Sequence, residues 1–219
     1  MARIARVVVP RYPHHVTQRG CRRQQTFFND GDYKHYLDLL QSTKASAGVE
    51  VWAYCLMPNH VHLIVVPETE QGLSRFLGPA HWQFALDINR RMGWKGHLWQ
   101  ERFHSFAMDE PHLYAAVRYV ELNPVRTGLC TLAREWRWSS ARAHLSGEDA
   151  CLVSVQPMLE RVDNWADYLS CQNSVVSDDS IRKHGQTGRP AGDDDFIGTV
   201  ETIVRRRLKK QKPGPKPER

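Results

Sequence analysis

Three stretches of the chain carry apolar residues at the spacing of an amphipathic helix. They cover residues 30–47, 74–91 and 111–123. Asp30 has a side chain suited to capping the first helix, and Gly48 suits its left-handed end. Pro111 is tolerated in the first turn of the third helix, and Pro124 ends it because the residue before a proline avoids the helical region. The apolar period therefore predicts three helices before Pro124.

Extended segments separate these helices. The runs that favour strands are 6–9, 14–18, 49–56, 60–66 and 99–108. Only Met57, Pro58 and Asn59 separate the third run from the fourth, so we expect these two strands to pair antiparallel, because a parallel crossover needs about a dozen residues or more. The order strand, helix, strand pair, helix, strand, helix predicts an α+β fold with one antiparallel sheet and helices covering one face.

The pattern changes beyond residue 147. We divide the chain into a body, an acidic connector and a C-terminal part at 1–147, 148–192 and 193–219. After residue 147 the sequence predicts one short helix at 157–169 and then a linker at 178–195, which is rich in Asp, Gly and Pro. Apolar residues at helical spacing predict an amphipathic helix over 193–210, and we expect the basic tail after it to be disordered.

Charge is distributed unevenly along the chain. The 219 residues have a net charge of +6. Residues 1–147 carry 18 Lys and Arg against 12 Asp and Glu, residues 148–204 carry 4 against 11, and residues 205–219 carry 8 against 1. A basic body and a very basic tail indicate a polyanionic partner such as nucleic acid. The alternative is an ordinary solvated surface.

Composition excludes several protein classes. With 41% hydrophobic and 25% charged residues, the chain is typical of a globular protein rather than a disordered, collagen-like or coiled-coil one. No apolar run approaches the roughly 20 residues of a membrane helix. The start of the chain lacks a signal-peptide core, so we expect a cytoplasmic, nucleoid-associated protein with no membrane partner. The 5 cysteines form no C-x-x-C pair, and we expect reduced thiols without a functional role.

The sharpest local chemical signal is the pair His60 and His62. Alternate residues of a strand share a face, so these imidazoles stand roughly 7 Å apart along one side of the predicted strand and can converge on a divalent ion. The alternative is a pair of hydrogen-bonded histidines at the end of a strand, because H-x-H alone is a weak motif.

The third predicted helix carries a second set of chemical groups. Tyr119 and Asn123 are four residues apart, which places them on one face of the helix. A tyrosine beside a metal ion can act as a nucleophile toward phosphorus, and the asparagine oxygen can complete the metal shell. The alternative is that Tyr119 only packs in the core.

Two stretches interleave aromatic and basic residues, at 94–106 and 136–142. Aromatic rings beside cations provide stacking platforms for unpaired bases. The alternative is an aromatic core from which the arginines reach the surface.

Four ordered motifs resemble those of the HUH single-tyrosine transposases, and in particular the branch of REP-associated tyrosine transposases. They are LMPNHVHLIV (56–65), LWQERFHSF (98–106), RYVELNPVRTGL (118–129) and WRWSSARAHL (136–145). Two further segments fit the same pattern, HVTQRGCRRQ (15–24) and FFNDGDYKHYLDLL (27–40). The resemblance implies a ferredoxin-like or RRM-like fold with the strand of the two histidines at its centre.

Matched residue by residue, the resemblance implies a role for each group. His60 and His62 match the two metal-binding histidines, and Tyr119 matches the nucleophile. Asn123 matches the position of a further ligand, where many single-tyrosine transposases have glutamine. The implied cofactor is Mg²⁺ or Mn²⁺. Our candidates for phosphate contacts are basic residues of the loop after the first strand and of the tail, namely Arg19, Arg22, Arg23, Arg205, Arg206, Arg207, Lys209 and Lys210.

The resemblance implies a metal-dependent endonuclease and strand transferase, a DNA transposase that cleaves single-stranded DNA beside a REP-like hairpin. Tyr119 would attack the phosphate and hold the DNA as a 5′-phosphotyrosine. The resemblance also allows a homodimer, since single-tyrosine transposases often pair. Two other functions stay open: a hairpin-binding regulator that has lost cleavage, and a metal-dependent hydrolase that forms no covalent intermediate.

Overall fold

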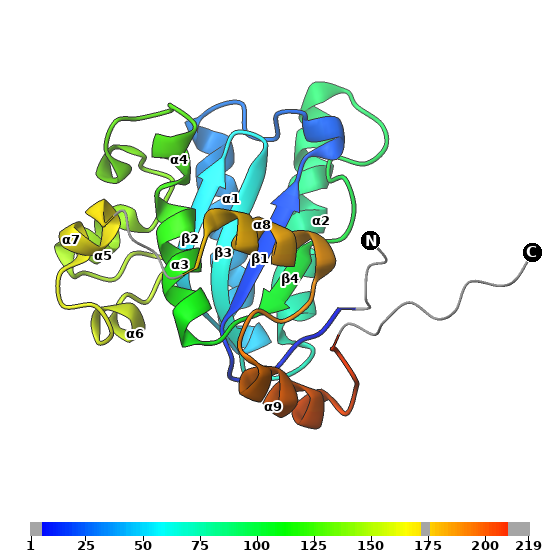
Figure 1. Ribbon diagram of the computed structural model, residues 1–219. Helices are drawn as coiled ribbons and strands as arrows, with labels where there is room; N and C mark the ends of the chain where they lie inside the picture. The colour runs from blue at the N-terminus through cyan, green and yellow to red at the C-terminus, as the bar shows by residue number, and fades with distance from the viewer. Residues whose placement is uncertain (1–5, 172–175, 210–219) are drawn as a thin grey trace, which may run out of the picture.

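The computed structural model describes residues 6–171 and 176–209, and Figure 1 shows one sheet surrounded by helices. The strands are β1 (His14–Arg19), β2 (Val49–Met57), β3 (His60–Pro67) and β4 (His104–Ala107). The longer helices are α1 (Asp30–Ala47), α2 (Gly72–Met92), α3 (Glu110–Glu121), α8 (Asp178–Thr187) and α9 (Asp194–Val204). The short ones are η1 (Cys21–Arg23), α4 (Asn123–Arg126), η2 (Ala133–Glu135), α5 (Ala141–Ser146), α6 (Gln156–Leu159) and α7 (Trp165–Ser170). None of the helices in these two ranges is long and apolar enough to cross a membrane.

The four strands form one antiparallel sheet in the order β2-β3-β1-β4. With α1 and α2 they follow the β-α-β-β-α-β order of a ferredoxin-like fold, which confirms the α+β prediction. β3 lies between β2 and β1, so the strand of the two histidines is central. In the register of the sheet, His62 lies opposite Thr17 of β1 and Cys55 of β2.

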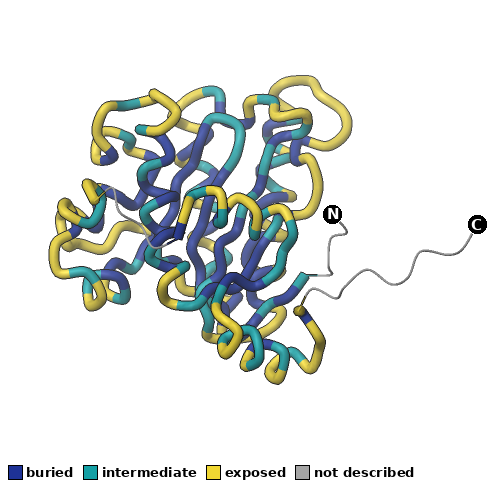
Figure 2. The backbone as a smooth tube through the Cα atoms, viewed as in Figure 1, coloured by how far each residue is buried: buried dark blue, intermediate teal, exposed yellow. Residues whose placement is uncertain are grey.

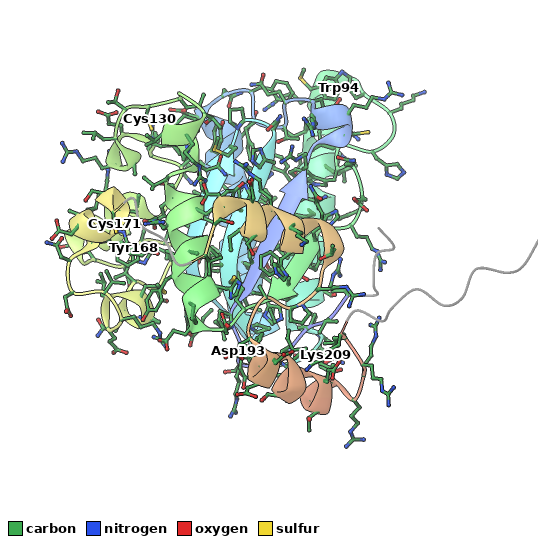
Figure 3. The ribbon with its side chains drawn as sticks, viewed as in Figure 1. Trp94, Cys130, Tyr168, Cys171, Asp193 and Lys209 are labelled. Carbon is green, nitrogen blue, oxygen red and sulfur yellow. The ribbon has the colours of Figure 1, made fainter. Side chains whose placement is uncertain are left out.

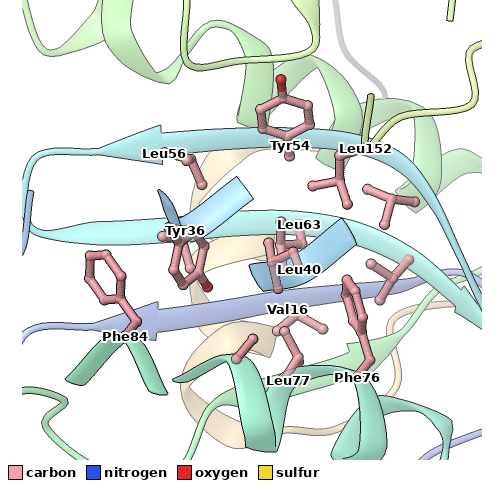
Figure 4. Packing of buried hydrophobic residues seen from close by; sticks show 14 of the residues in the cluster. Val16, Tyr36, Leu40, Tyr54, Leu56, Leu63, Phe76, Leu77, Phe84 and Leu152 are labelled. Atoms are coloured by element: carbon pink, nitrogen blue, oxygen red, sulfur yellow. The ribbon is translucent and has the colours of Figure 1, made fainter. Parts of the chain in front are cut away.

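α1 and α2 pack on one face of the sheet and form the larger core. Val16 and Leu63 of the two central strands share this core with Tyr36 and Leu40 of α1 and Phe76 of α2 (Figure 4), and all five side chains are fully buried. Figure 2 shows the same distribution along the backbone, with buried segments in the sheet and exposed ones in the outer helices and loops. Burial of each aliphatic side chain contributes about 1.5–3 kcal/mol, so this layer anchors the fold.

The helices lie on both faces of the sheet, which corrects the expectation that they cover one face only. α3 packs on the opposite side, where Leu113, Val117 and Val120 share a second core with Ile64 of β3 and Phe106 of β4. α8 contacts α3, β4 and β1 on the same side, and in Figure 1 it crosses in front of the sheet. The physical reason lies in β3, whose apolar residues alternate between the two faces, so that both faces need a cover.

Several element boundaries differ from the predicted ones. The first helix ends at Gly48 with the left-handed φ of 60° that glycine permits, but its cap is Asn29, whose side chain accepts from the Asp32 amide. Residues 6–9 form no strand, and the run at 99–108 is a strand only over β4. The helix predicted at 157–169 is split into α6 and α7, because Asn164 caps a new helix. The division into body, connector and C-terminal part stays a prediction.

The predicted linker at 178–195 is wrong, because it contains α8 and the start of α9. α9 is shorter than predicted and ends at Val204, followed by Arg205 with a left-handed φ of 49°. Asp193 and Lys209, labelled in Figure 3, mark the two ends of this C-terminal segment. Lys210 and the rest of the basic tail lie outside the described residues.

Candidate active site

The start of β3 presents His60 and His62 side by side. Their ring centroids lie 4.9 Å apart, because alternate side chains of a strand project from the same face. Asn59 precedes the pair and accepts a hydrogen bond from His60 Nδ1 at 2.7 Å. The Asn59 Oδ1 atom can only accept, so the proton of the neutral His60 ring sits on Nδ1 and the Nε2 atom carries a lone pair.

The tautomer of His62 follows from its two partners. The Asn123 Nδ2 atom, which can only donate, lies 3.1 Å from His62 Nε2, so Nε2 accepts. The proton of the neutral ring is then on Nδ1, which donates to His15 Nε2 at 2.9 Å. His15 in turn carries its proton on Nδ1, a buried atom with no hydrogen-bond partner among the described residues. Both histidines of the pair therefore present an unprotonated Nε2.

Tyr119 lies beside these histidines on α3. Asp109 caps this helix by accepting from the His112 amide, and Pro111 occupies its first turn. The Tyr119 ring centroid lies 5.6 Å from that of His62 and 6.2 Å from that of His15. Asn123, one turn further along the chain, is buried against His62. Residues from β1, β3 and the end of α3 thus meet at one point.

Two arginines hold Tyr119 from the other side. The Arg126 guanidinium lies 4.1 Å from the centre of the Tyr119 ring and donates to the Tyr119 carbonyl oxygen. It also donates to Asp178 of α8 at 2.8 Å. The Arg182 guanidinium lies 5.9 Å from the same ring centre, and its interaction with the Tyr119 side chain is the main cause that raises the pKa of Arg182.

These groups open on a cavity of about 410 Å³. Its wall includes His15, His60, His62 and Tyr119, and its charged lining residues are three arginines, Arg19, Arg23 and Arg182, with one carboxylate, Glu101. Arg22 and Arg23 both have positive φ, at 52° and 62°, in the turn that brings Arg23 to the cavity. Such backbone conformations are strained for residues with a side chain and tend to occur at functional sites. The excess of guanidinium groups suits an anionic ligand.

Burial keeps the histidines of the site neutral. It lowers the pKa of His15 to about 3 and, with a smaller contribution from the charge of Arg19, that of His60 to about 3. Burial and the neighbouring His60 and His15 place the pKa of His62 well below its ordinary value. Neutral imidazole is the form that binds a metal ion.

The donor set at this point fits a divalent ion. Adjacent ligands of an octahedral ion with bonds of about 2.1 Å lie roughly 3.0 Å apart, and the Asn123 amide lies 3.1 Å from His62 Nε2. Rotation of the amide by half a turn presents its oxygen. The set consists of two imidazole nitrogens and one amide oxygen. Among the described residues, neither this site nor any other place holds a cluster of three or more His, Cys, Asp or Glu that could bind a metal ion, so the set depends on the Asn123 amide.

The predicted phosphate-contact residues separate into two groups. Arg19 and Arg23 line the cavity, whereas Arg22 is exposed outside it. The other group, Arg205, Arg206, Arg207 and Lys209, follows α9 and does not line this cavity. Lys209 pairs with Asp194 at 2.8 Å.

Four residues of the site were missed from the sequence. His15 lies one strand away from His62, and its place in the same face of the sheet follows only from the register of β1 against β3. Asn59 joins His60 to the basic loop, since its Nδ2 donates to the Arg23 carbonyl at 2.9 Å. Arg126 and Arg182 carry no local signal, because one follows the predicted helix and the other lies in the predicted linker.

A larger cavity of about 730 Å³ lies between α2 and residues 96–103. It shares only Gln18, Gln100 and Glu101 with the smaller cavity and contains neither histidine of the pair nor Tyr119. The candidate site is the smaller cavity, because His15, His60, His62 and Tyr119 converge there.

The aromatic and basic stretches contribute mainly to the core. Trp99 and Phe103 are buried among the residues of α1 and α2, and Trp138 stacks on Tyr33 with the Arg137 guanidinium 4.5 Å from its ring centre. Trp94 is partly exposed, at 38%. The interpretation of an aromatic core with arginines reaching the surface therefore holds for most of these residues.

Comparison with known proteins connects this geometry to a family. A protein of Haemophilus influenzae described as a REP-associated tyrosine transposase is 26% identical over 110 residues, which span 45% of this chain and 62% of that protein. A solved structure of a REP-associated tyrosine transposase bound to a REP hairpin matches with a TM-score of 0.55 and 22% identity, covering 70% of this chain and 92% of that one. At this identity the structural match shows the fold alone.

The family model described as "Transposase IS200 like" matches residues 8–123. This region makes up more than half of the 219 residues and contains β1 to β4, α3, both histidines of the pair, Tyr119 and Asn123. The chain belongs to the IS200-like transposase family.

Proposed function

We propose that this protein is a DNA strand transferase that cleaves single-stranded DNA beside a hairpin and holds the cut strand as a 5′-phosphotyrosine. The observation that carries the proposal is the convergence of Tyr119 and Asn123 on His62, with an Asn123–His62 distance of 3.1 Å and a Tyr119–His62 ring separation of 5.6 Å. Family membership supports DNA as the substrate. The similarity to a structure that contains a REP hairpin motivates the choice of hairpin DNA.

The proposed reaction is a transesterification at phosphorus. The Tyr119 oxygen attacks the phosphate in line, a phosphorus–oxygen bond to tyrosine forms, and the bond to the 3′ oxygen of the preceding nucleotide breaks. The proton lost by the tyrosine hydroxyl is balanced by the proton gained by the leaving 3′ hydroxyl. The phosphodiester energy is kept in the tyrosine link, so a 3′ hydroxyl can later reverse the step without a nucleotide cofactor.

Each neighbouring residue has a place in this reaction. Arg126 holds the end of α3 and the face of the Tyr119 ring, and His15 fixes the ring of His62. Arg19 and Arg23 provide positive charge for the phosphate as it gains negative charge in the transition state. His60, His62 and Asn123 would hold the Mg²⁺ or Mn²⁺ that membership in this family implies, which supplies Lewis-acid stabilisation of the phosphate.

The proposed site assembles within one chain. Tyr119 and both histidines come from the same protomer, so the tyrosine can act on a phosphate bound by its own subunit. Pairing with a second copy stays a prediction that this geometry does not require.

The test of the proposed function is covalent capture of DNA. A single-stranded hairpin oligonucleotide carrying a 3′ label is incubated with the protein and Mn²⁺, and a labelled band at the size of the protein–DNA adduct is sought on a denaturing gel. We expect Tyr119→Phe to abolish the adduct while hairpin binding stays within about threefold, because only the attacking oxygen is removed. Tyr114→Phe is the matched control, since Tyr114 lies on the same helix with its hydroxyl on Glu110 at 3.2 Å.

The same assay separates the other two functions. A regulator that has lost cleavage would bind the hairpin without any product. A hydrolase would release free 5′-phosphate fragments and no adduct, with Tyr119→Phe still active. EDTA, His60→Ala and His62→Ala should each remove the adduct, and cleavage that survives all three would contradict the proposed metal site.

A further inference from the structure

Arg182 reaches the candidate active site from outside the region that matches the family. It lies on α8, beyond residues 8–123, in a segment whose composition predicted a linker. Its side chain nevertheless lines the same cavity as His60, His62 and Tyr119.

Contacts at both ends of α8 hold it in place. At its start, Ser177 caps the helix and Asp178 accepts from Arg126, the arginine that also holds the Tyr119 ring. After its end, the Ala191 amide donates to the Ala107 carbonyl at 2.8 Å, and the Asp109 amide donates to the Ala191 carbonyl at 2.9 Å. In the middle, Ile181 is buried in the second core with 1% exposure. These contacts hold α8 against the sheet.

This position places Arg182 over Tyr119. Asp178 and Arg182 are four residues apart, so they lie on one face of α8, with Asp178 on Arg126 and Arg182 on Tyr119. The Arg182 guanidinium lies 5.9 Å from the ring centre, within reach of the Tyr119 side chain. The only polar atom of that side chain is the hydroxyl oxygen, the atom that attacks phosphorus in the proposed reaction.

Arg182 also remains accessible to a ligand in the cavity. Its side chain is 56% exposed, and its ion pair with Asp179 at 3.1 Å is between two exposed groups, so it is weak and exchangeable. Arg126 differs in this respect, because its guanidinium is engaged with the Tyr119 carbonyl, the Tyr119 ring and Asp178. Of the two arginines on Tyr119, Arg182 is the one that can turn toward a phosphate.

We propose that Arg182 is a catalytic residue of the tyrosine site, which orients the Tyr119 hydroxyl and contacts the scissile phosphate during attack. This role rests on the proposed function and adds a residue to it. The bonds made and broken are unchanged, and the guanidinium donates hydrogen bonds to oxygens that gain negative charge in the transition state, a contribution for which a bidentate cation is well suited. α8, which lies outside the region that matches the family, thereby supplies part of the active site.

The experiment compares Arg182→Ala, Arg182→Lys and Lys183→Ala. Lys183 is the matched control, because it is the next residue of α8, is exposed and does not line the cavity. We measure the single-turnover rate of adduct formation with the labelled hairpin, and the Kd for the same DNA in the Tyr119→Phe background, where no cleavage occurs. Thermal unfolding confirms that each variant is folded.

We expect Arg182→Ala to slow adduct formation at least tenfold while Kd changes less than threefold, since removal of one such donor typically costs about 10²–10³ in rate. Arg182→Lys should retain part of the rate, and Lys183→Ala should match the wild type. A rate that is unchanged or raised in Arg182→Ala, an equal reduction in Lys183→Ala, or a reduction accounted for by Kd alone would overturn the role. Absence of any adduct with the wild-type protein would overturn the proposed function as well.

Discussion

At the scale of single residues, Glu121 connects the site to the core. It lies between Tyr119 and Asn123 in the sequence. Its carboxylate is fully buried and accepts from three donors: Ser140 Oγ, His144 Nδ1 at 2.7 Å and Trp165 Nε1 at 2.9 Å. The donors come from segments roughly 20 to 45 residues further along the chain. This network ties the end of the tyrosine helix to α5 and α7.

Replacement of Glu121 should be costly to stability. We expect Glu121→Leu to lower the free energy of unfolding by about 3–5 kcal/mol, because the three buried donors are left without an acceptor. Glu121→Gln should cost less, since its amide oxygen still accepts. Urea unfolding monitored by tryptophan fluorescence measures both, with the exposed Glu135→Gln as control. A decrease below about 1 kcal/mol for Glu121→Leu would show that the network contributes little.

Two elements, α1 and α2, meet through a buried polar pair. Tyr36 of α1 shares a hydrogen bond with His81 Nε2 of α2 at 2.8 Å, and the two rings are stacked. Burial lowers the pKa of His81 to about 3. The folded protein therefore keeps His81 neutral, while the unfolded chain protonates it near 6.5. Stability from this site is complete above about pH 6.5 and is lost as the pH falls toward about 3.

The pH dependence of stability tests this helix contact. A histidine with this shift costs roughly 2 kcal/mol of stability between about pH 7 and pH 5. The unfolding free energy of the wild type decreases between about pH 7 and pH 5. We expect this decrease to be about 2 kcal/mol smaller in His81→Gln, because glutamine does not titrate and can keep the bond to Tyr36. Urea titrations at the two pH values measure it, with exposed His97→Gln as control. An identical pH dependence in His81→Gln and wild type would contradict the assignment.

α8 shows how an element can escape prediction. Its sequence is polar and is followed by a segment that contains Gly and Pro. One buried residue, Ile181, secures the helix to the core. A single apolar residue cannot produce the helical repeat of apolar positions from which a helix is predicted. The helix is stabilised instead by its packing on α3 and β4, which are far away in the sequence.

At the scale of the whole molecule, two groups of basic residues lie apart from each other. Arg19, Arg23 and Arg182 line the cavity, whereas Arg205, Arg206, Arg207 and Lys209 follow α9. Leu208 is buried with Val7, Val9 and Val200, and Glu201 accepts from the Lys209 amide at 2.8 Å. The chain is thus anchored as far as residue 209, and the basic residues after it can be deleted while this anchor stays intact.

Deletion of residues 210–219 should weaken DNA binding through charge alone. The segment contains four Lys and Arg and one Glu. We expect the slope of log Kd against log salt to fall by up to about 0.7 for each phosphate of a single strand that the tail neutralises, with stability unchanged. Binding is measured over a salt series, and a neutral Gly/Ser tail of equal length is the control for chain length. If the slope of the truncated protein equals that of the full chain, the tail is not a phosphate-binding segment.

The spacing of residues within one element was sufficient to predict much of this protein. It placed His60 and His62 on one face of a strand and β2 against β3, because backbone geometry sets which neighbours share a side. It also placed Asn123 one turn beyond Tyr119, although α3 ends at Glu121 and Asn123 begins α4. The tertiary structure decided what no local period encodes: that α3 and α8 cover the second face of the sheet, that His15 orients His62, and that Arg126 and Arg182 hold Tyr119. These contacts join segments separated by tens of residues, and they form only where packing of both faces of the sheet brings them together.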